Sequence, residues 1–83
     1  MKLQKELQPT IDKMNTIKDK IIPYAKNLKE NGEYNDFETR LAWDVLRSVY
    51  KSNEICAWYD KYNCNDSHIT TMAKAALKTV GYN

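Results

Sequence analysis

Three side chains in the last third of the chain are of the types that ligate zinc. Cys56, Cys64 and His68 follow one another with the spacing C-x7-C-x3-H, and Asp60 and Asp66 lie among them. Structural zinc sites use four ligands, usually with closely spaced cysteine pairs, whereas this stretch offers three good ligands and no such pair. We therefore predict neither a metal site nor a cofactor. Cys56 is instead expected to be a small buried side chain on the apolar side of a helix.

Residues that could do acid–base or nucleophilic chemistry are few. The chain has a single histidine, no glycine-rich phosphate-binding loop, and no pair of carboxylates isolated among apolar residues. Asp44, which stands between Trp43 and Val45, is the carboxylate that we expect to be partly buried. Helical spacing favours a pair with Arg40 or Arg47 over a role as general base. We predict that the protein is not an enzyme.

The C-terminal stretch has the outline of a helix-turn-helix, with a short helix, a polar break and a second helix. The exposed side of the second helix would hold five side chains that could contact phosphates and base edges: His68, Thr70, Thr71, Lys74 and Lys78. The break, residues 63–66, contains no glycine, the second helix contains no arginine, and Asp60 and Asp66 would repel phosphates. A DNA-binding regulator that uses residues 53–80 is the alternative function.

Seven apolar side chains and one threonine recur at alternating spacings of three and four near the N-terminus, at Leu3, Leu7, Thr10, Met14, Ile17, Ile21, Tyr24 and Leu28. Such a seam is typical of a helix that packs lengthwise against another helix. Aromatic residues gather in the middle of the chain, and a short helix cannot bury Trp58, Tyr59 and Tyr62 on one narrow side. We predict a protein interface, toward a partner protein or a second copy, formed by Leu7, Met14, Ile17, Ile21, Tyr24, Trp43, Tyr59 and Tyr62.

Helices must position these side chains, because two glycines and two prolines are too few turn signals for an all-β chain of 83 residues. The apolar periodicity predicts an all-α fold with four helices, over residues 2–31, 36–51, 53–62 and 67–80. We expect one domain, residues 1–83, that forms a compact helical bundle with a helix-turn-helix-like C-terminal pair. Pro23 is predicted to bend the first helix.

The expected helix boundaries follow from residues that favour caps. Gly32 and Gly81 suit the positions just past a helix end. Asn35, followed three residues later by Glu38, resembles a capping box for the second helix. Ser52 or Asn53 is expected to cap the third helix, and Asp66 or Ser67 the last.

The overall composition indicates no strongly charged partner. The formal net charge is +2, although residues 1–30 alone hold seven lysines against four acidic residues. Two cysteines and an N-terminus without an apolar core favour a cytoplasmic protein with reduced thiols. No stretch approaches the roughly 20 apolar residues that span a bilayer, so we predict no direct membrane insertion.

The chain is rich in lysine, asparagine, isoleucine and tyrosine, and it combines this composition with a short helical layout and few cysteines. It resembles the small accessory proteins of AT-rich phages, including T-even-type phages. The resemblance implies a protein that blocks a host enzyme, a host defence or the phage's own lysis machinery, as the lysis-inhibition antiholins do. It is one of general character and assigns no functional residue. With the predicted interface, it favours a cytoplasmic inhibitor or regulator that binds a partner protein.

Overall fold

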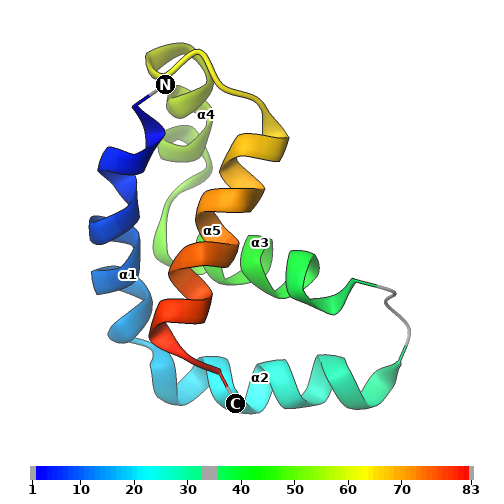
Figure 1. Ribbon diagram of the computed structural model, residues 1–83. Coiled ribbons are helices and arrows are strands. Elements are labelled where there is room, and N and C mark those ends of the chain that lie inside the picture. The colour runs from blue at the N-terminus through cyan, green and yellow to red at the C-terminus, as the bar shows by residue number, and fades with distance from the viewer. Residues whose placement is uncertain (1, 33–35, 83) are drawn as a thin grey trace.

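The computed structural model describes residues 2–32 and 36–82, and every regular element in these ranges is helical (Figure 1). A short 3-10 helix, η1 (Leu3–Glu6), precedes five α-helices: α1 (Leu7–Asn15), α2 (Lys18–Asn31), α3 (Phe37–Val49), α4 (Ser52–Lys61) and α5 (Asp66–Val80). The predicted all-helical fold is confirmed, and the last three helices lie within two residues of their predicted bounds. The predicted count of four helices is wrong.

The difference comes from the first predicted helix, residues 2–31, which the structure divides at Thr16 and Ile17. Ile17 leaves the helical region, with φ −121° and ψ 20°, and α2 turns away from α1 to cross below its end (Figure 1). The Thr16 hydroxyl and the Thr16 amide both donate to the carbonyl of Lys13, at 2.6 Å and 3.2 Å, where α1 ends. The chain therefore changes direction at Thr16 and Ile17. The sequence analysis predicts this change at Pro23 instead.

Both prolines lie inside helices. Pro9 is the third residue of α1, in the first turn, where its missing N–H removes no hydrogen bond that the helix needs. Pro23 lies in the interior of α2, where an amide at this position would bond the carbonyl of Asp19. The prediction of a bend near Pro23 is wrong, because α2 runs without interruption from Lys18 to Asn31.

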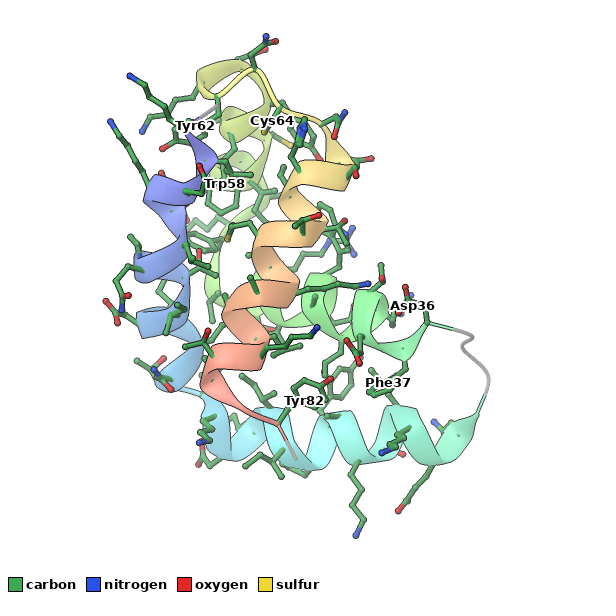
Figure 2. All side chains as sticks on the ribbon, in the orientation of Figure 1. Asp36, Phe37, Trp58, Tyr62, Cys64 and Tyr82 are labelled. Atoms are coloured by element: carbon green, nitrogen blue, oxygen red, sulfur yellow. The ribbon has the colours of Figure 1, made fainter. Side chains whose placement is uncertain are left out.

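Two pairs of helices form the compact body. α1 and α5 lie side by side and run in the same direction, whereas α2 and α3 form an antiparallel pair that crosses their lower ends in Figure 1. α4 lies at the opposite end, next to the start of the chain. Phe37 and Tyr82 meet edge-to-face between α3 and the end of the chain, with ring centroids 6.2 Å apart (Figure 2). The four helices α1, α2, α3 and α5 thus enclose a common interior.

α5 is the most regular contributor to this core. Six apolar side chains recur along it at helical spacing, and all six are buried: Ile69, Met72, Ala73, Ala76, Leu77 and Val80. Ala73 and Ala76 have no exposed surface, and such small side chains allow neighbouring helices to approach closely. α5 therefore turns one continuous apolar stripe toward the interior.

The N-terminal seam also serves this core. Five of its eight positions are buried in the chain's own interior: Leu3, Thr10, Met14, Ile21 and Leu28. Leu7 and Ile17 are half-buried, and Tyr24 is 40% exposed. Most of the seam therefore finds its packing partner in this chain, and the length of the seam is not by itself a sign of an external one.

The caps show where local hydrogen bonds fix the helix starts. The side-chain oxygen of Asn65 accepts from the His68 amide at 3.1 Å, and His68 Nδ1 accepts from the Asn65 amide at 3.2 Å, so α5 is capped one residue before the predicted position. The N-cap of α4 is Lys51, not the predicted Ser52 or Asn53. The Lys51 amide donates to the Glu54 carboxylate at 3.0 Å. Asp36 caps α3.

Two further expectations concern the helix ends. The predicted capping role of Asn35 lies outside the described residues. Gly32 (φ 63°) and Gly81 (φ 82°) end α2 and α5 with positive φ, as the sequence predicts.

Candidate functional site

The predicted interface residues do not form one surface. Met14 and Ile21 are 0% and 2% exposed, so the prediction that they contact a partner is corrected: their side chains fill the chain's own core. Leu7 lies in a groove between the N-terminal segment and α5. Tyr62, the residue that follows α4, donates a hydrogen bond to the Glu6 carboxylate, which ties the end of α4 to the start of the chain.

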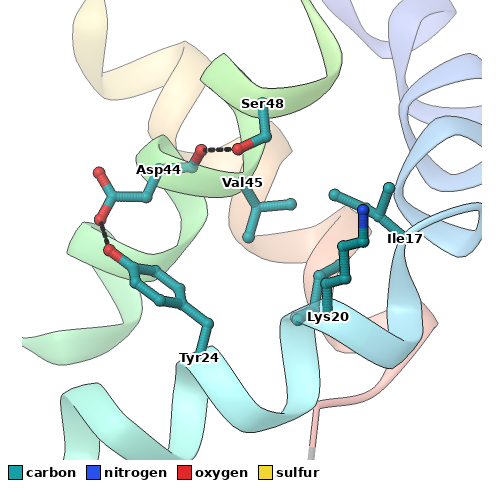
Figure 3. Close-up of a pocket in the computed structure, with 7 residues that line it drawn as sticks. Ile17, Lys20, Tyr24, Asp44, Val45 and Ser48 are labelled. Atoms are coloured by element: carbon teal, nitrogen blue, oxygen red, sulfur yellow. Dashed lines mark hydrogen bonds between the residues drawn. The ribbon is translucent and has the colours of Figure 1, made fainter.

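Ile17 and Tyr24 line an open groove between α2 and α3 (Figure 3). The groove measures about 660 Å³, and its full lining is Ile17, Lys20, Ile21, Tyr24, Asp44, Val45 and Ser48. Among the described residues, Ile22 and Tyr24 are the large apolar side chains that are exposed. Ile22 lies outside this groove, so Tyr24 is the exposed ring that borders it.

A hydrogen-bonded chain closes one side of this groove. The Asp44 carboxylate accepts from the Tyr24 hydroxyl (Figure 3). It also accepts from Arg40 Nε, at 3.0 Å. The hydrogen bond to Asp44 is the main reason why the pKa of Tyr24 is raised above 10. The Asp44 side chain is 19% exposed, which confirms the predicted partial burial. Its ion pair with Arg40 confirms the predicted pairing with an arginine. Three side chains from two helices are thus held in fixed positions.

A second groove lies on the other side of α3. It measures about 720 Å³ and is lined by Asp36, Thr39, Arg40, Trp43, Arg47, Tyr59 and Asp66. The Arg47 guanidinium lies over the Trp43 ring, 5.2 Å from its centroid. The Trp43 indole donates to Thr70 Oγ1 at 2.8 Å, which fixes the ring against α5. Trp43 and Tyr59, two of the predicted interface residues, are therefore brought to one groove.

Arg40 joins the two grooves, because it bonds Asp44 on one side and lines the groove of Trp43 and Arg47 on the other. We call the five residues that meet here the α3 face: Tyr24, Arg40, Trp43, Asp44 and Arg47. Its two arginines are the only arginines in the chain. They lie seven residues apart, which places them on the same side of α3, two turns apart.

The carboxylates beside the α3 face already have partners. Asp36 accepts from Thr39 Oγ1 at 2.6 Å and forms an ion pair with Lys74 at 3.3 Å, and these contacts lower its pKa. Asp66 accepts from the Tyr59 hydroxyl, which is the main cause that raises the pKa of Tyr59 to about 12. Asp36 and Asp44 are thus balanced by Lys74 and Arg40, whereas Asp66 keeps its negative charge beside Arg47 because its partner, Tyr59, is neutral.

Sequence reasoning missed these arginines as binding residues because it followed apolar stripes. A usable signal was present: two arginines seven residues apart with a tryptophan between them, in a chain that has no other arginine.

The five residues predicted to read DNA do not share one open side of α5. Thr70 accepts from Trp43, and Lys74 pairs with Asp36, so both lie against α3. His68 caps its own helix and, with Thr71, lines the groove beside the N-terminal segment. Lys78 is exposed. The expectation that these side chains form a single exposed surface is therefore wrong.

The cysteine positions also differ from expectation. Cys56 is exposed, not buried, because Ile55 and Trp58 point into the core and residue 56 lies about 100° around the helix from residue 55. Cys64 is half-buried, its thiol donates to the Trp58 carbonyl at 3.3 Å, and burial raises its pKa. Within residues 2–32 and 36–82, no three histidine, cysteine or acidic side chains are grouped as a metal ion would require.

Within the same ranges, no helix combines the length and the apolar character needed to span a bilayer. Comparison of the chain with protein-family models, with curated proteins and with solved structures gives no match.

Proposed function

We propose that the protein is a non-enzymatic binding module, which acts by occupying a surface of a partner protein with its α3 face. One observation carries this proposal: a tyrosine, a tryptophan and the chain's two arginines meet on one face between two grooves. Tyrosine, tryptophan and arginine are the residue types that most often dominate the binding energy of protein interfaces.

The internal contacts of the α3 face support the same function. Arg40 is held by Asp44, Arg47 is stacked on Trp43, and Tyr24 is held by its own bond to Asp44. Side chains that are already ordered lose less conformational entropy when a partner binds, so more of the contact energy is left for affinity. The α3 face is thus ordered by its own contacts in the free chain.

A module of this kind fits an inhibitor or regulator, because blocking or redirecting another protein needs a tight contact and no reactive group. The resemblance to phage accessory proteins supports an inhibitor that acts on a host or viral protein in the host cytoplasm. DNA binding by residues 53–80, with α4 and α5 as a helix-turn-helix, stays a prediction, and no specific contact favours it.

Affinity capture from the native host lysate tests the proposal. Immobilised wild-type protein is compared with Arg40→Glu/Arg47→Glu and with the matched control Lys5→Glu/Lys61→Glu, which reverses two charges in a separate groove. We expect one protein, identified by mass, to be retained by the wild type and the control and lost with the arginine variant. Capture of no protein by the wild type, or equal capture by all three, would overturn the proposal.

A further inference from the structure

We infer that a groove between the N-terminal segment and the end of α4 binds the phosphate group of a small, soluble phosphomonoester. The groove measures about 650 Å³ and is lined by Lys2, Lys5, Lys61, Tyr62 and Asn63. Three of these five residues are lysines, and none is acidic. No residue of the α3 face lines this groove, so the site is separate from the proposed function and goes beyond it.

The 3-10 geometry of η1 brings two of the lysines to one side of the N-terminal segment. The Lys5 amide donates to the Lys2 carbonyl at 3.0 Å, which closes a turn of the 3-10 type. Side chains three residues apart eclipse one another in such a turn, so Lys2 and Lys5 extend on the same side. Leu3, which lies between them, is 1% exposed and anchors the segment in the core. The anchored turn therefore leaves both lysines exposed at the groove.

A hydrogen bond between distant parts of the sequence brings the third lysine to the same groove. The Tyr62 hydroxyl donates to the Glu6 carboxylate, so the end of α4 lies beside the start of the chain (Figure 2). Lys61 Nζ lies 5.2 Å from the centroid of the Tyr62 ring. Asn63 follows with a positive φ of 49°, which ends the helix in a left-handed turn. Lysines from the two ends of this hydrogen-bonded junction thus meet in one groove.

The charge balance of this groove is positive. Neither of the ion pairs found within residues 2–32 and 36–82 involves Lys2, Lys5 or Lys61. Glu6 keeps its negative charge because its partner is a neutral tyrosine hydroxyl, whereas Asp60 lies about 100° around α4 from Lys61 and does not line the groove. Three ammonium groups against the Glu6 carboxylate leave a local charge of +2. A phosphomonoester carries a charge of about −1.5 to −2 near pH 7, which this local charge balances.

Ammonium groups from two segments suit a phosphate better than a carboxylate. A lysine ammonium is a compact charge with three donors, and lysine is a common binder of phosphate. A phosphomonoester presents three acceptor oxygens, so ammonium groups on both sides of the groove can contact it together. At about 650 Å³, the groove lies in the size range of small-molecule sites. It therefore leaves room for the body of the ligand beside Tyr62 and Asn63.

A lipid headgroup and duplex DNA are poorer sources of the phosphate. Among the described residues, Ile22 and Tyr24 are the exposed large apolar side chains, and both lie on α2, at the opposite end of the molecule (Figure 1). A membrane would thus gain no large apolar contact beside this groove. Duplex DNA carries about one negative charge per 1.7 Å of helix axis, and lysines gathered in one groove meet only a short part of that line. The observations therefore favour a small, soluble ligand.

Two-dimensional amide NMR of the full chain tests this site. The probes are adenosine monophosphate, inorganic phosphate and adenosine, which has no phosphate, and sodium chloride keeps the ionic strength constant. We expect the two phosphates to shift the amide signals of Lys2, Lys5, Lys61, Tyr62 and Asn63 along saturable curves. Adenosine should bind at least about tenfold more weakly than adenosine monophosphate.

Protein variants sharpen the test. Lys5→Gln/Lys61→Gln should weaken the binding of adenosine monophosphate about tenfold, because two charged contacts are lost. Lys2→Gln/Lys5→Gln should do the same while it leaves Lys61 stacked on its neighbouring ring. The matched control, Lys26→Gln/Lys29→Gln, removes two exposed lysines that line a different pocket and should leave the affinity unchanged. Unfolding temperatures confirm that each variant is folded.

Three results would overturn the inference. The first is the absence of saturable shifts at the groove, or equal affinity for adenosine and adenosine monophosphate. The second is an affinity that both groove variants leave unchanged or that the control lowers as much. The third is tighter binding of duplex DNA, or of phosphatidylcholine vesicles that contain phosphatidic acid, when the groove variants abolish that binding. Protein capture through Arg40 and Arg47 does not depend on any of these results, so this site and the proposed function can fail separately.

Discussion

The hydroxyl of Tyr50 donates a hydrogen bond to Thr10 Oγ1 at 3.0 Å inside the core, across forty residues of sequence. The direction follows because the one hydroxyl hydrogen of Thr10 is directed to the Glu6 carbonyl, at 2.6 Å. Tyr50 also meets Trp58 edge-to-face, with ring centroids 4.8 Å apart, and burial raises its pKa. This contact explains how the N-terminal seam accommodates a threonine, which is fully buried.

A double-mutant cycle should show that this pair is coupled. Tyr50→Phe removes one buried hydrogen bond and should lower the free energy of unfolding by about 1 kcal/mol. Thr10→Val should cost more, about 1–3 kcal/mol, because it leaves the Tyr50 hydroxyl buried without an acceptor. The double variant should be less destabilised than the sum of the two, as measured by urea unfolding. Strictly additive losses would show that the two hydroxyls do not interact.

The cap of α3 should make stability depend on pH in the acid range. The pKa of Asp36 is lowered from 3.8 by Thr39 and Lys74, so the folded state favours the ionised carboxylate. This contribution is complete above pH 3.8 and is lost as the pH falls through the lowered value. Asp36→Asn keeps a capping side chain without the charge. The wild type should melt at a higher temperature at pH 6, and the difference should shrink below pH 4; a constant difference would contradict this.

Tyr59 should titrate late because of its bond to Asp66. Its pKa is raised to about 12, so its neutral form is favoured in the folded protein, and the related stability is complete below pH 10 and lost as the pH rises toward 12. Asp66→Asn removes the negative charge and should lower the pKa of Tyr59 toward 10. Spectrophotometric titration of tyrosinate absorbance, with Tyr59→Phe to assign the signal, measures the change. An unchanged titration in Asp66→Asn would contradict the assigned cause.

The two prolines should differ in their effect on stability. Pro23→Ala restores an amide to the interior of α2 and should stabilise the protein by about 1–2 kcal/mol, after the entropy gained by the unfolded chain is subtracted. Pro9→Ala, in the first turn of α1, should be neutral or slightly destabilising for the same entropic reason. Thermal unfolding of both variants measures the contrast. A larger gain from Pro9→Ala than from Pro23→Ala would contradict the position of the helix starts.

Much of the fold was predictable because local pattern and tertiary packing agree. The apolar stripe of α5 recurs with one regular period, and every member is buried. The break at Thr16 and Ile17 was not predictable from that period, because the spacing of three and four continues across it without interruption. At the break, Ile17 has a non-helical backbone conformation and the Thr16 hydroxyl bonds the Lys13 carbonyl. The period of apolar residues reports neither feature.

The candidate site was predictable only in part. Tyr24 and Trp43 were expected at an interface, and both lie on the α3 face. The same reasoning included Met14 and Ile21, whose side chains are buried in the core. Apolar stripes cannot tell an internal partner from an external one when two helices of the same chain are able to supply it. The arginines became informative only when the structure placed them in one groove with the half-buried rings of Trp43 and Tyr59.

Hydrogen exchange of the complex with the captured protein tests the role of the α3 face most directly. Amide protection in the complex is compared with that of the free chain, helix by helix. We predict that the added protection falls on α3 and on α2 near Tyr24, while the exposed side of α4 around Cys56 exchanges as in the free protein. Added protection confined to α4 and α5, with none on α3, would contradict the proposed binding surface.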